Sequence, residues 1–136
     1  MIRIKQDKER ARSILGMIDE REKVVKKLDE IGFSTIIAEN YYEIIKELCT
    51  AIALTEGFKF VGDNSHKELI EFMKKNKEIT EGDVSIMDDL RIRRNKSSYE
   101  GRKIEIVYLE NNNESLLEII GKLKKVLKKK LEEDEV

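Results

Sequence analysis

Residues 34–57 carry apolar side chains at intervals of three and four along almost their whole length, and this pattern constrains the fold more than any other feature of the chain. Such spacing predicts an amphipathic helix. A helix that is apolar around most of its circumference is buried on several sides. We therefore expect a central helix that begins at Ser34 or Thr35 and ends at Gly57. Its predicted core positions are Ile37, Tyr41, Ile44, Ile45, Leu48, Ala51 and Ile52, with the small residues Ala38, Cys49 and Ala53 widening the stripe.

Two neighbouring segments are also expected to be helical. Residues 7–30 place their apolar side chains on one face, and Gly32 offers a natural C-terminal stop. Residues 66–76 form a shorter predicted helix. Before it, Ser65 and Glu68 match a capping box, in which each side chain satisfies a free backbone amide of the other residue.

A fourth helix is expected to begin at Thr80 or Gly82, to run to Tyr99 and to stop at Gly101. The pattern of residues 102–110 is ambiguous. Its alternating apolar residues favour a short extended piece, and an additional helical turn is the competing interpretation.

The last predicted helix covers residues 114–132, with Asn113 as its N-cap and a charged tail at about residues 132–136. Cations near a helix C-terminus interact favourably with the helix dipole. We prefer this interpretation of its lysine-rich outer face to an RNA-binding tail. The lysines concerned are Lys122, Lys124, Lys125, Lys128, Lys129 and Lys130.

These segments together predict an all-α protein with a single domain over residues 1–136. Five helices with short connections, no convincing sheet and no proline indicate an antiparallel up-and-down bundle of four long helices and one short helix. The short helix is expected to pack at the side of the bundle.

The composition excludes several kinds of site. Cys49 is the only cysteine and His66 the only histidine, so the chain can form neither an internal disulfide nor a structural zinc site of about four such ligands. We expect Cys49 in the core, His66 exposed in the first turn of its helix, and neither metal nor cofactor.

The chain begins with a charged stretch, and no apolar run approaches the roughly 18 residues of a membrane span. We therefore expect a soluble, cytoplasmic protein without a membrane partner. Abundant Lys, Glu and Ile with little Gln is typical of thermophile proteins. The net charge of −1 argues against an overall basic nucleic-acid binder but leaves local patches open.

One local patch is the segment 88–103, which holds six cations against three acids. Arginine outnumbers lysine here, and its planar fork of donors matches phosphate oxygens. On a helix, Arg91, Asn95 and Tyr99 would form one polar row, while Arg94 and Ser98 would lie on another side. The predicted ligand-binding residues are Arg91, Arg94, Asn95, Ser98 and Tyr99.

The segment "RNKSSYEG" resembles the signature of the HEPN family (higher eukaryotes and prokaryotes nucleotide-binding domain), an arginine followed four to six residues later by histidine. Arg94 matches the arginine, Asn95 matches the polar neighbour common in the family, and Tyr99 stands where the histidine is expected. The stretches "AENYYEIIKELCTAIALTEGF" and "NSHKELIEFM" resemble the same family, so the similarity spans about residues 5–130.

The resemblance implies a helical bundle that dimerises, with the signatures of both protomers facing a shared cleft. Many such proteins are metal-independent endoribonucleases, often toxins paired with a nucleotidyltransferase antitoxin. Others have lost catalysis and bind RNA or assist assembly. Tyr99 departs from the pattern: a phenol with a pKa near 10 is a poor base at neutral pH, whereas histidine titrates near 6.5.

Three hypotheses follow. The first is a catalytically degenerate HEPN-like homodimer whose basic cleft binds RNA or a nucleotide phosphate, with a nucleotidyltransferase as a further partner. The second is an active metal-independent endoribonuclease in which Arg94 stabilises the transition state and Tyr99 is the acid. The third is a structural scaffold in which Arg91, Arg94 and Tyr99 only bind acidic residues, either Asp88 and Asp89 or Glu43 and Glu47 on the neighbouring helix.

Overall fold

The structure is a computed structural model that describes residues 1–28 and 30–133 of the chain, and within them it is all-α apart from one small sheet. Four long helices account for most of it, and a short helix and a 3₁₀ turn follow the second strand. The helices are α1 (Lys8–Lys27), α2 (Glu30–Glu56), α3 (Ser65–Phe72), α4 (Glu81–Glu100) and α5 (Ile106–Glu132), with the 3₁₀ turn at Met73–Lys75.

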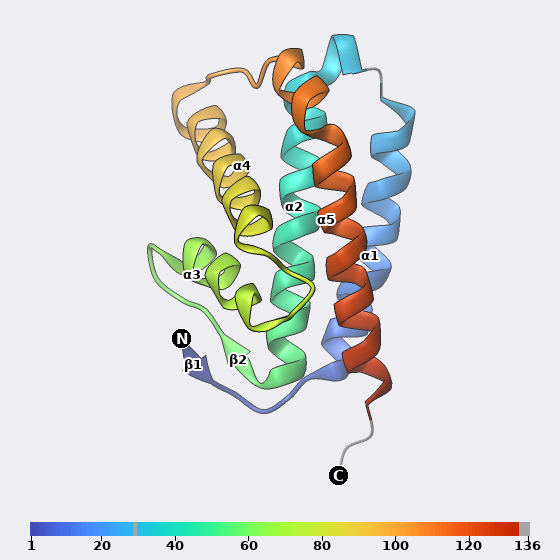
Figure 1. Cartoon of the computed structure of the whole chain (residues 1–136), viewed down its shortest axis with the longest axis vertical. Helices are drawn as coiled ribbons and strands as arrows, with labels where there is room; N and C mark the ends of the chain where they lie inside the picture. The colour runs from blue at the N-terminus through green and yellow to red at the C-terminus, as the bar shows by residue number, and fades with distance from the viewer. Residues whose placement is uncertain (29, 134–136) are drawn as a thin grey trace.

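The long helices α1, α2, α4 and α5 alternate in direction, and α3 lies at the side of the bundle below α4 (Figure 1). Helix α2 packs against all the other helices, and the predicted core positions along it are buried. The predicted central role of this helix is therefore confirmed. Its apolar circumference requires partners on several sides, and this requirement places the remaining helices around it.

The junction between α1 and α2 differs from the prediction. Helix α1 ends at Lys27 because Leu28 turns to an extended conformation (φ −89°, ψ 140°). Gly32 is therefore not the stop of the first helix, since α2 has already begun at Glu30. The backbone kinks at Phe33 (φ −132°, ψ 30°), one residue before the predicted helix start. Asp29, inside the predicted first helix, lies outside the described residues.

The hydroxyls of Ser34 and Thr35, predicted as N-caps, bind the chain before α5 instead. Both donate to the backbone oxygen of Ile104, at 2.8 Å and 3.3 Å, and the amide of Ile104 donates to Thr35 Oγ1 at 2.9 Å. Helix α5 begins at Ile106, so the helical-turn alternative is correct for residues 106–110. Asn113 is consequently no cap but lies inside α5, where its side-chain oxygen accepts a hydrogen bond from Tyr41.

The predicted capping box at Ser65 and Glu68 is wrong. Ser65 is already helical, and the N-cap residue Asn64 makes no side-chain capping bond. A complete capping box occurs at α4, where Thr80 Oγ1 accepts from the Asp83 amide and the Asp83 carboxylate accepts from the Thr80 amide, both at 3.0 Å. The predicted stop of α4 is confirmed, because Gly101 adopts the left-handed conformation (φ 67°).

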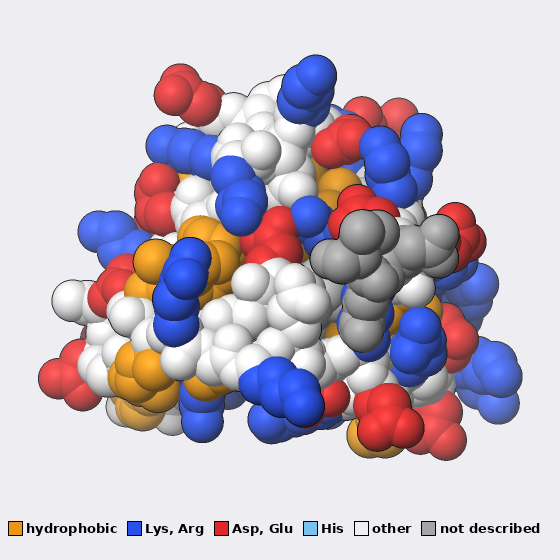
Figure 2. Space-filling model, turned by 90° about the horizontal axis from the view of Figure 1, so that it is seen from below, with side chains coloured by type: hydrophobic (Ala, Val, Ile, Leu, Met, Phe, Trp, Pro, Cys, Tyr) orange, Lys and Arg blue, Asp and Glu red, His pale blue; other side chains and the backbone are white. Residues whose placement is uncertain are grey.

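A two-stranded antiparallel sheet, not predicted from the sequence, joins β1 (Ile2–Arg3) to β2 (Phe58–Lys59). The sheet forms directly after α2, where the chain turns sharply at Gly57. Gly57 takes φ +82°, and a Cβ there would lie 2.8 Å from the backbone oxygen of Ile4. Figure 2 shows this end of the molecule, where acidic and basic side chains are interspersed with small groups of hydrophobic atoms.

The lysine-rich outer face of the last helix also forms ion pairs within the bundle. Three of its lysines reach acids on neighbouring helices: Lys122 binds Asp83, Lys124 binds Glu22, and Lys130 binds Glu56. Most of the predicted C-terminal tail lies outside the described residues. Among the helices that the structure describes, none combines the length and the apolar character that crossing a membrane requires.

Candidate functional site

Arg94 belongs to the predicted basic segment on α4, and its side chain points toward α2. Its Nη2 atom lies 3.3 Å from Oε1 of Glu43, and its guanidinium lies 5.4 Å from the centre of the Tyr42 ring. About a quarter of the Arg94 side chain remains exposed. The guanidinium therefore has an ion-pair partner and an aromatic neighbour, yet it still reaches solvent.

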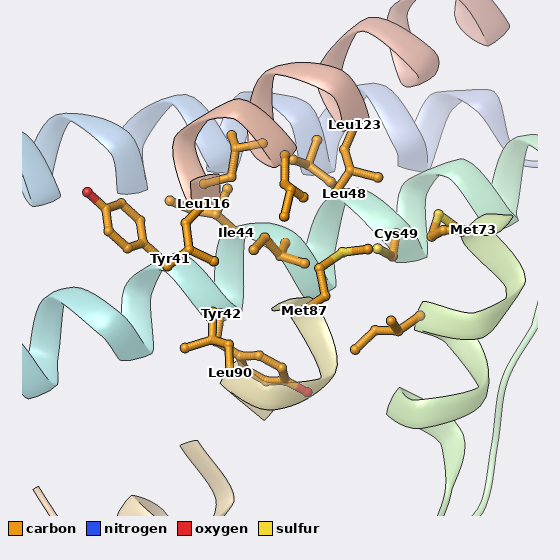
Figure 3. Close-up of a cluster of buried hydrophobic side chains, with 14 of the residues drawn as sticks. Tyr41, Tyr42, Ile44, Leu48, Cys49, Met73, Met87, Leu90, Leu116 and Leu123 are labelled. Atoms are coloured by element: carbon orange, nitrogen blue, oxygen red, sulfur yellow. The ribbon is translucent and has the colours of Figure 1, made fainter. Parts of the chain in front are cut away.

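Tyr42 connects this arginine to the only histidine of the chain. Its hydroxyl oxygen lies 3.0 Å from Nδ1 of His66, and the tyrosine is 1% exposed. Figure 3 shows that Tyr41 and Tyr42, although adjacent in sequence, leave α2 in opposite directions. Burial raises the pKa of Tyr42 to about 12 despite the opposing charges of Arg94 and Arg91, so the phenol stays protonated at neutral pH.

His66 lies in the first turn of α3, as predicted, but it is half-buried rather than exposed. Burial lowers the pKa of its imidazole, and the positive charges of Lys46, Arg94 and Arg91 lower it further, while Glu43 opposes them. Three cations against one carboxylate thus act on the ring. The imidazole is neutral at pH 7 and remains able to accept a proton.

Glu43 is shared between two cations, because Lys46 Nζ lies 2.8 Å from its Oε2 atom while Arg94 approaches its Oε1 atom. We call Tyr42, Glu43, Lys46, His66 and Arg94 the His66 cluster. Two cations and one carboxylate leave it with an excess of positive charge. The cluster is assembled from α2, α3 and α4, so it depends on the packing of three separate helices.

Two other predicted site residues stand beside this cluster. Arg91 binds Asp88 in its own helix at 2.8 Å and is largely buried. Asn95 is half-buried one turn further along α4. The contacts of Arg91 with Asp88 and of Arg94 with Glu43 are two of those that the scaffold hypothesis predicted.

Tyr99 does not join Arg94. The tyrosine is 81% exposed, and no hydrogen bond of its hydroxyl occurs within the described part of the chain. Ser98 is exposed as well. The physical reason is helical spacing: residues five apart lie about 140° apart around the axis, so Arg94 and Tyr99 cannot both face α2.

Further polar contacts continue on both sides of the cluster along α2. Glu39 accepts a bond from Ser97 at 3.5 Å, and Glu47 accepts three bonds from the Arg21 guanidinium of α1 at 2.8–3.1 Å. Glu39, Glu43 and Glu47 recur every four residues and therefore form one charged row along the helix.

Cys49 is distant from this chemistry. It is fully buried, and Figure 3 shows its thiol among the side chains of Met73 and Met87. Burial raises the pKa of the thiol to about 12, so it is not a nucleophile at neutral pH. The prediction of a core role is confirmed. Within residues 1–28 and 30–133, no group of three or more His, Cys, Asp or Glu side chains is placed to hold a metal ion.

Sequence reasoning missed Tyr42, Lys46 and His66 as members of the site. Two signals were present: acids at four-residue intervals inside an otherwise apolar helix, and a single imidazole in the whole chain. Neither signal identifies the partner helix. Comparisons with protein-family models, with curated proteins and with solved structures found no match to this chain.

Proposed function

We propose that this protein is a HEPN-like homodimer that binds the phosphate groups of RNA or of a nucleotide at the His66 cluster. The observation that carries the proposal is the partly exposed guanidinium of Arg94 beside a neutral imidazole, in surroundings where cations outnumber carboxylates. Arginine binds phosphate through two parallel hydrogen bonds, and a neutral imidazole adds a donor without an added charge.

Glu43 would compete with the ligand in this site. In the free protein its carboxylate forms ion pairs with Arg94 and Lys46, and an incoming phosphate would have to displace it from both cations. Arg91 and Asn95 flank the cluster on α4. Tyr99, with its exposed ring, is suited to stack on a base next to the bound phosphate, a contact that tolerates any sequence. The phenol then contributes contact area rather than proton transfer.

The exposed apolar side chains around the charged row of α2 support the homodimer. Met17 and Val24 are about half exposed, and they flank Arg21 on α1 at spacings of four and three residues. Arg21 itself binds Glu47 of the row. Ile36, also about half exposed, precedes Glu39 by three residues. An interface over this face would bury these side chains and bring two copies of the row together.

Light scattering coupled to gel filtration tests the dimer. We expect twice the monomer mass for the native chain and a monomer for Val24→Glu. Val107→Glu is the matched control, because Val107 has similar exposure but lies on α5. A native chain that is monomeric at micromolar concentration would contradict the shared cleft.

Fluorescence anisotropy with single-stranded RNA tests the binding. Arg94→Gln should weaken binding on the order of tenfold or more, because charge-assisted bonds to phosphate are lost. Arg102→Gln is the control: it removes the same charge from an exposed side chain whose one ion pair within residues 1–28 and 30–133 is with Glu100. Glu43→Gln should strengthen binding, because it frees both cations. If Glu43→Gln weakens binding as Arg94→Gln does, the ion pair is structural and the scaffold hypothesis is preferred.

One observation favours a second candidate, the metal-independent ribonuclease. His66 supplies the imidazole that the sequence signature lacks, close to Arg94 through Tyr42. In this role His66, not Tyr99, would accept the proton of the attacking 2′-hydroxyl and return it to the leaving 5′-oxygen. Cleavage of RNA in the presence of a chelator, lost in His66→Gln and retained in Tyr99→Phe, would support it. Intact RNA after prolonged incubation would favour the catalytically degenerate protein.

A nucleotidyltransferase partner remains part of the proposal through the family resemblance. Co-expression of the two proteins followed by purification of a tagged copy tests it directly. A stable complex that retains RNA binding would support a module for assembly as well as for binding.

A further inference from the structure

A second concave site adjoins the His66 cluster. A pocket of about 160 Å³ lies where the end of α2, the strand β2 and the start of α3 meet. Its lining includes the apolar residues Ala53, Leu54, Phe58, Phe60 and Leu69. Lys46 and His66 belong both to its lining and to the cluster, so the two sites are contiguous.

The charged side chains that line the pocket are all cationic. Arg10, Lys46 and Lys59 line it, and no carboxylate side chain does. In a chain whose acids and bases nearly balance, three cations without an acid form a local excess of positive charge. Thr50, Ser65 and His66 add neutral hydrogen-bonding groups to the lining.

Arg10 differs from the other arginines in the contacts of its side chain. The other seven arginine side chains each contact a carboxylate, a backbone oxygen or an aromatic ring, but the Arg10 guanidinium has no such contact within residues 1–28 and 30–133. Lys59 likewise has no ion pair among the described residues. Two of the three cations are therefore available to a ligand without first breaking an internal pair.

We propose that this pocket holds a terminal phosphate monoester, at the end of an RNA strand or on a free nucleotide. A monoester carries nearly two negative charges at pH 7, whereas an internal phosphodiester carries one, and three cations suit the dianion better. The volume fits a phosphate group with part of its sugar and is below the roughly 300 Å³ typical of sites for larger ligands. The base stays outside.

This inference rests on the proposed function, because it places the strand end in the pocket and the next phosphates at the His66 cluster. Lys46 and His66 would then contact both groups. Tyr42 orients His66 for this purpose: when the phenol donates to Nδ1, the ring proton lies on Nε2 and is available to a phosphate oxygen.

The test compares RNA oligonucleotides of one sequence with a 5′-phosphate, with a 3′-phosphate and with neither, by anisotropy of an internal label. We expect one phosphorylated form to bind on the order of tenfold tighter than the unphosphorylated form. Arg10→Gln and Lys59→Gln should reduce this ratio to about one. Lys67→Gln, an exposed cation of α3 that does not line the pocket, should leave it unchanged. Arg94→Gln should weaken all forms and preserve the ratio.

A second measurement uses the single histidine of the chain as a probe. Uridine 5′-monophosphate should shift the imidazole signal of His66 in the proton NMR spectrum, and uridine should not. Equal affinity for all oligonucleotides, together with no shift by the monophosphate, overturns the pocket. Failure of every RNA to bind while the monophosphate still shifts His66 would instead contradict the proposed RNA function and keep the pocket as a nucleotide site.

Discussion

The hydroxyl of Tyr42 lies 3.0 Å from Nδ1 of His66, and this contact connects the most buried aromatic residue of α2 to the first turn of α3. Because the phenol is almost without solvent contact, the imidazole is its hydrogen-bond partner in place of water. The same ring of Tyr42 lies under the Arg94 guanidinium. One buried side chain thus positions both the cation and the imidazole of the candidate site.

Tyr42→Phe should destabilise the protein by about 1–2 kcal/mol, because it leaves His66 without its buried partner. Thermal or urea unfolding measures the change. Tyr108→Phe is the control: the Tyr108 hydroxyl is also buried but has no hydrogen-bond partner among the described residues. Its removal should be neutral or stabilising. Equal losses in both variants would show that the Tyr42 contact adds nothing specific.

The stability of the protein should fall as the pH drops below about 6.5. Burial and neighbouring cations lower the pKa of His66 in the folded state, so the unfolded chain binds more protons in the window below its ordinary value of about 6.5. Stability therefore rises with pH through this window and is lost on acidification. Urea titrations at several pH values should show this slope in the native chain and a flatter profile in His66→Gln.

Thr80→Ala should cost about 1 kcal/mol, because Thr80 caps α4 through the Asp83 amide. Burial opposes ionisation of Asp83, but hydrogen bonds from the Thr80 amide and from Lys122 outweigh it and hold the pKa of Asp83 below its usual value. The stability from this group is present above about pH 4 and is lost as the pH falls through the lowered pKa. Ser85→Ala, exposed on the same helix, is the control for urea unfolding.

Glycine substitutions should have opposite effects at different positions. Gly57→Ala should destabilise by more than about 1 kcal/mol, because φ is +82° and the new Cβ meets the Ile4 oxygen. Gly16→Ala and Gly121→Ala should each stabilise by up to about 1 kcal/mol, because both glycines lie inside long helices with nothing within 4 Å of the new methyl. Circular dichroism melts would show the two directions, and a stabilised Gly57→Ala would contradict the tight end of α2.

Cys49 should not react with a disulfide reagent such as dithionitrobenzoate while the protein is folded. The thiol is fully buried, and burial raises its pKa to about 12. Labelling should proceed only through unfolding, so its rate should increase in urea in parallel with the unfolded fraction. Rapid labelling of the native protein would mean that the core around Cys49 opens locally.

The positions of the helices were largely predictable, because apolar spacing and capping residues are local features. The central helix, the end of α4 at Gly101 and the burial of Cys49 follow from short stretches of sequence. Three of the cap assignments that failed have tertiary causes. Ser34 and Thr35 bind Ile104 across 70 and 69 positions of the chain, and Asn113 accepts from Tyr41 across 72. Side chains that resemble caps were used for long-range contacts instead.

The candidate site shows the same division. The sequence by itself determined that Arg91 and Arg94 lie on a helix beside Asn95, because these residues are neighbours in one continuous segment. Only the tertiary structure decided that Arg94 meets Glu43 across 51 positions and that Tyr42 meets His66 across 24. The physical reason is that helical periodicity reports which face of a helix is buried, whereas the packing of three helices determines which side chains meet there.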